Sequence, residues 1–106
     1  MTVKDFSIHA PATLPAGDVT LRVRNAGPAT HEFVVVRTDL DADALPIGSD
    51  GLSVNEDWLQ FVDELDEIPM WTTASLTLHL APGRYVFFCN LEGHYLGGMH
   101  RAVEVV

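Results

Sequence analysis

Apolar and polar residues alternate with a period of two along both ends of the chain. The clearest examples are residues 19–23, 76–80 and 103–105, in which every second position is Val or Leu. This alternation is typical of half-buried strands, which place apolar side chains on one face only. Two continuous hydrophobic runs, residues 33–36 and 85–89, come after turns that contain Gly and Pro, and they are further strand candidates. The pattern predicts a mostly β protein.

The middle of the chain, between about residues 39 and 71, follows a different pattern. Residues 53–56 have the spacing of a capping box. The apolar residues that follow at helical intervals are Trp58, Phe61, Val62, Leu65 and Ile68. We therefore predict one amphipathic helix, roughly from Asn55 to Glu67, which ends before Pro69. Trp58 and Trp71 are expected to lie in the core beneath it.

The same insertion concentrates the negative charge of the chain, since it holds ten of the fifteen acidic residues. The predicted exposed face of the helix carries Glu56, Asp57, Asp63, Glu64, Asp66 and Glu67. An acidic helix face is usually only a solvated surface. Charge gathered in one insertion can also steer a partner with a basic surface toward the protein. The sequence leaves both interpretations open.

Length and composition fit one domain that spans residues 1–106. The chain is 47% hydrophobic, and six basic residues against fifteen acidic ones give a formal charge of −9. Nucleic acid and anionic membranes are poor partners for such a chain, because both bind through Lys and Arg. No apolar stretch approaches the ~20 residues that span a bilayer. The first five residues lack the apolar core of a signal peptide, although such a signal can be removed from a mature chain.

A thiol, an imidazole and a thioether follow one another at intervals of five residues, at Cys89, His94 and Met99. Thiolate and thioether favour Cu(I), and imidazole accommodates both Cu(I) and Cu(II). Two His and one Cys with a distant Met form the copper geometry used for electron transfer. A second imidazole is therefore needed. His31 is the obvious donor, because it follows a turn at the start of a strand.

With these residues in view, the sequence resembles the cupredoxins, the small blue-copper proteins. The matching segments are residues 25–27, 31–33, 82–89 and 93–94, together with Met99. The Cys-x4-His-x4-Met spacing is similar to that of the auracyanin, rusticyanin and sulfocyanin branches. The resemblance implies an all-β, Greek-key β-sandwich and one copper ion bound by His31, Cys89, His94 and Met99. Glu32 stands where many relatives have an asparagine that ties the two ligand loops together.

The resemblance also implies a function, which is one-electron transfer by a type 1 copper site that cycles between Cu(II) and Cu(I). It implies a monomer that is not an enzyme, is periplasmic or extracellular, and passes electrons to a redox partner protein. Electrons would pass through the outer edge of His94, ringed by Pro28, Ala29, Tyr95 and Leu96. Three alternatives stay open: a copper carrier or metallochaperone, a domain of a larger copper oxidase or nitrite reductase, and a metal-free interaction module.

Overall fold

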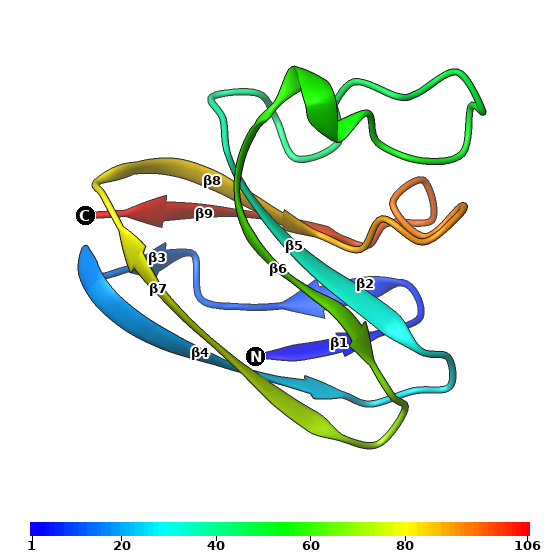
Figure 1. The fold of residues 1–106 in the computed structure, drawn as a ribbon, viewed down its shortest axis with the longest axis horizontal. Coiled ribbons are helices and arrows are strands. Elements are labelled where there is room, and N and C mark those ends of the chain that lie inside the picture. The colour runs from blue at the N-terminus through cyan, green and yellow to red at the C-terminus, as the bar shows by residue number, and fades with distance from the viewer.

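Two β-sheets packed face to face make up the structure, a computed structural model that describes residues 1–106 (Figure 1). One sheet has the strand order β2-β1-β4-β7, and the other has the order β3-β9-β8-β5-β6. The strands are β1 (Thr2–Lys4), β2 (Ser7–His9), β3 (Thr13–Leu14), β4 (Gly17–Asn25), β5 (His31–Arg37), β6 (Gln60–Ile68), β7 (Thr73–Leu80), β8 (Gly83–Phe88) and β9 (His100–Val105). The all-β prediction is confirmed. The structure has no helix of the length and apolar character that crossing a membrane requires.

The main core lies between the two sheets, where the period-two alternation places the apolar side chains. On β4, Leu21 and Val23 are buried whereas Arg22 and Arg24 are exposed. Sixteen buried residues form this core. The rings of Phe33 and Phe87 meet at its centre with 5.0 Å between their centroids. Full burial of an aliphatic or aromatic side chain of this size stabilises the fold by about 1.5–3 kcal/mol.

A second, smaller core covers the outer face of β5 and β8. Its seven buried residues are Val34, Val36, Leu45, Val54, Val86, Phe88 and Tyr95. The Tyr95 hydroxyl donates a hydrogen bond to Ala42 O (2.6 Å) and accepts one from Leu45 N (3.0 Å). The segment between β5 and β6 is thus fixed across the sheet. This second core explains why the hydrophobic runs in β5 and β8 are continuous, since both strands are buried on both faces.

The amphipathic helix predicted from Asn55 to Glu67 is wrong. Gln60–Ile68 is strand β6, which pairs antiparallel with β5, and only Glu56–Trp58 forms a single 3-10 turn. The register between β5 and β6 shifts twice. Each extra residue changes the inward spacing from two to three, so Val62, Leu65 and the fully buried Ile68 all contact the main core. Two irregularities in one strand therefore imitate a helical spacing.

The prediction that Trp58 and Trp71 lie in a core beneath the helix is also wrong. Trp58 is 77% exposed and Trp71 is 59% exposed. Without a helix there is no buried underside for Trp58, which lies on the 3-10 turn. Trp71 packs against the backbone of Gly27, where an added Cβ would come within 2.8 Å of its ring.

Carboxylates of β5, β6 and the 3-10 turn interact with one another instead of with cations. Burial raises the pKa of Glu64 to about 7, and a hydrogen bond with Asp66 and the charges of Asp66, Glu56 and Glu32 add to this effect. Burial and the charge of Glu56 likewise raise the pKa of Glu32. Both ion pairs of the structure involve histidine, so no Lys or Arg neutralises these groups. We call Glu32, Glu56, Glu64 and Asp66 the carboxylate cluster.

The raised pKa of Glu64 predicts a stability that falls as the pH rises. Between about pH 4.5 and pH 7 the folded protein keeps a proton on Glu64 that the unfolded chain has lost, so ionisation favours unfolding. Glu64→Gln should therefore raise the free energy of unfolding at pH 8 by about 1 kcal/mol, a value reduced for solvent screening. At pH 4 the variant and the wild type should be equally stable.

Urea unfolding of the metal-free protein at pH 4, 6 and 8 measures this difference. Glu104→Gln, at an exposed position of β9, is the matched control and should follow the wild type. Equal stability of Glu64→Gln and wild type at pH 8 would contradict the prediction.

Candidate metal centre

Three predicted ligands converge at one end of the sandwich: His31, Cys89 and His94. His31 Nδ1 lies 3.2 Å from His94 Nδ1, Cys89 Sγ lies 3.5 Å from His94 Nδ1, and Cys89 Sγ lies 3.9 Å from His31 Nδ1. His31 and Cys89 are fully buried, and His94 is half-buried. Atoms that share one ion at bond lengths of about 2.0–2.3 Å must lie within about 4.6 Å of each other. The three donors satisfy this condition.

Strand pairing brings His31 and Cys89 together. β5 and β8 pair antiparallel from Val34 and Phe88 onward, so the first residues of β5 lie beside the residue that follows β8. The backbone N–H of Glu32 donates a hydrogen bond to Cys89 Sγ (3.3 Å). Burial raises the pKa of the Cys89 thiol, although N–H donors from Leu91 and Glu32 oppose this effect. A bound cation would favour the thiolate.

The turn before β5 is held by Asn25, a fully buried polar residue. Its side-chain nitrogen donates to Ala29 O and to Ile68 O, both at 2.8 Å. Its side-chain oxygen accepts from Gly27 N at 2.8 Å. These three hydrogen bonds fix the backbone of the turn that precedes His31, and so help to set the position of His31.

The loop of residues 89–99 curls back on itself and brings the backbone of Met99 beside those of Cys89 and His94. Gly93 and Gly98 have φ angles of 79° and 116°, a region that favours glycine. Met99 N donates to His94 O (3.2 Å), and Met99 O accepts from Cys89 N (3.2 Å). The Met99 side chain is fully buried in the main core. Its assignment as a fourth ligand stays a prediction.

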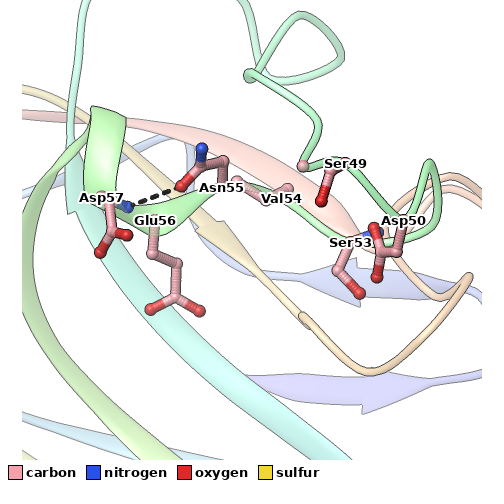
Figure 2. A pocket seen from close by; sticks show the side chains of 8 residues that line it. Ser49, Asp50, Ser53, Val54, Asn55, Glu56 and Asp57 are labelled. Carbon is pink, nitrogen blue, oxygen red and sulfur yellow. Dashed lines mark hydrogen bonds between the residues drawn. The ribbon is translucent and has the colours of Figure 1, made fainter.

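Asn90 connects this loop to the segment between β5 and β6, a role that the sequence analysis missed. Its side chain bonds to Val54 N (2.7 Å), Val54 O (3.1 Å) and Glu56 Oε2 (2.7 Å), and Gly93 N donates to Leu52 O (2.9 Å). The two segments lie side by side in Figure 1, in green and orange. Figure 2 shows the open pocket on this segment, lined by residues 48–50 and 53–57. None of the three donor residues lines it.

Two further residues of the site come from the turn between β1 and β2. Asp5 Oδ1 lies 2.8 Å from His31 Nε2. The Phe6 ring stands edge-on to His94, with 5.6 Å between centroids. The sequence offers no spacing that links these residues to ligands so far along the chain.

One member of the predicted apolar ring around His94 is wrong, and the other three stay predictions. Pro28 and Leu96 are exposed, and Ala29 is half-buried. Tyr95 is buried in the second core, so its assignment to the ring is wrong. Phe6, which is 49% exposed and packs on His94, contributes the aromatic group at this surface.

Burial also controls the charge of the site. Burial lowers the pKa of His31, and the nearby His94 adds to this effect, whereas Asp5 opposes it. A lowered pKa keeps the ring neutral, which is the form that binds metal ions. The donor set and its burial therefore fit a resident metal ion with a preference for nitrogen and sulfur ligands.

Comparison with solved structures identifies the fold. The sequence matches no protein-family model and no curated protein. Reduced auracyanin from Roseiflexus castenholzii superposes with a TM-score of 0.68 at 23% identity over 97% of this chain and 90% of its own. Auracyanin B gives a TM-score of 0.64 at 23% identity, over 99% of this chain and 88% of its own.

Rusticyanin from Thiobacillus ferrooxidans gives a TM-score of 0.64 at 19% identity, over 89% of this chain. This chain spans only 59% of that rusticyanin. The agreement extends over nearly all of the present chain, so the β-sandwich predicted from the sequence resemblance is confirmed. The protein has the cupredoxin fold of auracyanin and rusticyanin.

Proposed function

We propose that the protein transfers single electrons through one copper ion held by His31, Cys89, His94 and Met99. The observation that carries this proposal is the buried triangle formed by two imidazole nitrogens and one thiol sulfur. These donors are the ones found in electron-transfer copper sites. The fold is shared with auracyanin and with rusticyanin, which is a copper protein.

Bound copper would supply the exchange of one electron between Cu(II) and Cu(I). Cys89 would supply the thiolate, His31 and His94 the two imidazole nitrogens, and Met99 the thioether. His31 begins β5, Cys89 directly follows the paired strand β8, and both are fully buried, so we expect their positions to change little between the two oxidation states. His94 is the half-buried ligand and gives the route to the surface. Four protein donors leave no position for a substrate, so we infer a carrier and not an enzyme.

Burial also favours electron transfer over the alternative of a copper carrier. Handing a metal ion to another protein requires that its ligands become accessible, and neither His31 nor Cys89 has any exposed surface. Electrons need no such opening. The monomeric state and a periplasmic or extracellular location remain predictions from the resemblance.

The first test of the proposed function is the colour of the Cu(II) protein. Cys89 is the only cysteine, so it alone can supply the sulfur-to-copper charge transfer that makes such a site intensely blue. Cys89→Ser should abolish the visible absorption, whereas His79→Ala, at an exposed histidine, should keep it. A wild-type protein that remains pale when loaded with stoichiometric Cu(II) would refute the type 1 assignment.

The second test concerns Met99 and uses the exposed Met70 as its matched control. Met99→Gln should lower the reduction potential, because an oxygen donor favours Cu(II) over Cu(I) more than a thioether does. Each tenfold change in the ratio of the two affinities shifts the potential by about 59 mV. Voltammetry of Met99→Gln and Met70→Gln measures the shift. If both variants keep the wild-type potential, Met99 is not a ligand.

For the redox partner, we propose a protein with a basic docking surface. The carboxylate cluster lies next to the ligand loop, because Asn90 follows Cys89 and bonds to Glu56. β6 is an edge strand, and it presents Asp63, Glu64, Asp66 and Glu67 without any Lys or Arg partner. Uncompensated charge beside the ligand loop would attract a cationic partner and speed its encounter.

Neutralising β6 tests this docking role with a cationic c-type cytochrome as the probe. The variant carries Asp63→Asn, Glu64→Gln, Asp66→Asn and Glu67→Gln. We expect several-fold slower second-order electron transfer at low salt and a flatter salt dependence, because screening shortens from about 10 Å at 0.1 M to about 3 Å at 1 M. The visible spectrum should not change.

The matched control removes four exposed charges elsewhere: Asp18→Asn, Asp39→Asn, Asp41→Asn and Glu104→Gln. Stopped-flow rates across a salt series compare the two variants. Equal rates and equal salt slopes for both would show that only net charge matters and that β6 is not the docking surface.

A further inference from the structure

The turn between β1 and β2 contacts both histidines of the site. Asp5 contacts His31, and Phe6 packs against His94. Asp5 Oδ1 lies 2.8 Å from His31 Nε2, on the side of the ring that faces away from Cys89 and His94. We propose that Asp5 is a positioning residue for His31 and that its carboxylate strengthens divalent metal binding and lowers the reduction potential of the site. This inference rests on the proposed function.

The two ring nitrogens of His31 have separate tasks. Nδ1 points toward Cys89 and His94, so the ring binds an ion only when the proton lies on Nε2. His31 Nε2 and Asp5 Oδ1 are both buried, and neither atom meets hydrogen-bond geometry with any group, so their 2.8 Å approach is a close ion-pair contact. A carboxylate beside the second nitrogen of a metal-binding histidine fixes the tautomer and makes the ligand more basic.

The neighbouring backbone does not replace this carboxylate. The carbonyl of Gly27 accepts a hydrogen bond from Asp5 N (3.2 Å), and it also interacts with the His31 ring. A carbonyl oxygen can accept a hydrogen bond, but it carries no net charge. Only Asp5 places a negative charge on the far side of this ligand, which favours the more highly charged metal state.

The turn is held in place from both sides, so Asp5 is not a mobile surface carboxylate. Val3 is fully buried and pairs with Asn25 of β4. On the other side, an added Cβ at Gly97 would come within 3.0 Å of the Phe6 ring, and one at Gly98 would come within 3.0 Å of Phe6 O. The two glycines let the ligand loop approach the turn this closely.

The chain contains a natural control for this pair. Asp18 and His79 also lie 3.0 Å apart, but their side chains are 90% and 71% exposed, whereas those of Asp5 and His31 are 24% and 0% exposed. Water screens the exposed pair, so the loss of its charge should have little effect. Asp18→Asn is therefore the matched control: it removes the same charge beside a histidine as Asp5→Asn does, but at an exposed position away from the site.

The experiment compares Asp5→Asn, Asp5→Glu and Asp18→Asn with the wild type by two measurements. Titration of the metal-free proteins with Zn²⁺ should show about tenfold weaker binding for Asp5→Asn. Voltammetry of the copper-loaded proteins should show a higher potential, by about 59 mV for a tenfold change in the ratio of Cu(II) to Cu(I) affinity. Asp5→Glu should restore part of both values, and Asp18→Asn should match the wild type.

The inference would be overturned if Asp5→Asn kept the Zn²⁺ affinity and the reduction potential of the wild type. It would also be overturned if Asp5→Asn and Asp5→Glu changed these two values equally, because the charge would then not be the cause. If Asp5→Asn does not fold, Asp5→Ala removes the same charge and is judged by the same criteria. A wild-type protein that binds neither ion overturns the proposed function and this inference with it. Normal wild-type binding with no effect of Asp5→Asn overturns this inference alone.

Discussion

The antiparallel pairing of β5 with β8 is the constraint on which the metal centre depends. It aligns Val34 with Phe88, and so brings the start of one strand beside the end of the other. The hydrogen bond from Glu32 N to Cys89 Sγ continues this alignment into the site. Because both strands are buried on both faces, a slip of one residue would exchange the side chains of the two cores. The strand pairing of the sandwich thus sets the distance between His31 and Cys89.

The part of the chain that runs from the end of β5 through β6 supports the site in two separate ways. Its first part covers the outer face of β5 and β8 and holds the ligand loop through Asn90. Its second part, β6, extends the sheet and presents carboxylates at the edge. Charged residues on an edge strand also discourage pairing with another chain. Burial, and after it the neighbouring carboxylates, raise the pKa values of Glu32 and Glu64, so ionisation of these groups is unfavourable for the fold.

The sequence located the donors His31, Cys89 and His94, which the structure brings together, but it did not locate the residues that support them. Cys89, His94 and Met99 lie within eleven residues, and their chemical types are distinctive at that spacing. The helix prediction failed because pairing with β5 and two register shifts decide the conformation of β6, and neither is encoded locally. Asp5 and Phe6 were missed for a related reason. An acidic residue and an aromatic residue in a turn have no special pattern, and their role arises only when the two sheets pack.

Burial and negative charge act on the centre in complementary ways. Burial lowers the pKa of His31 and raises the pKa of Cys89, so it favours a neutral imidazole and a protonated thiol when no ion is present. A cation that enters must therefore displace the thiol proton, which couples its affinity to pH. Asp5 lies outside the ligand triangle and offsets part of this cost through its charge. The donor atoms can thus lie in an apolar core and still attract a cation. Apolar groups surround the donor atoms, and the negative charge of Asp5 lies behind His31, on the side of the ring that faces away from the other donors.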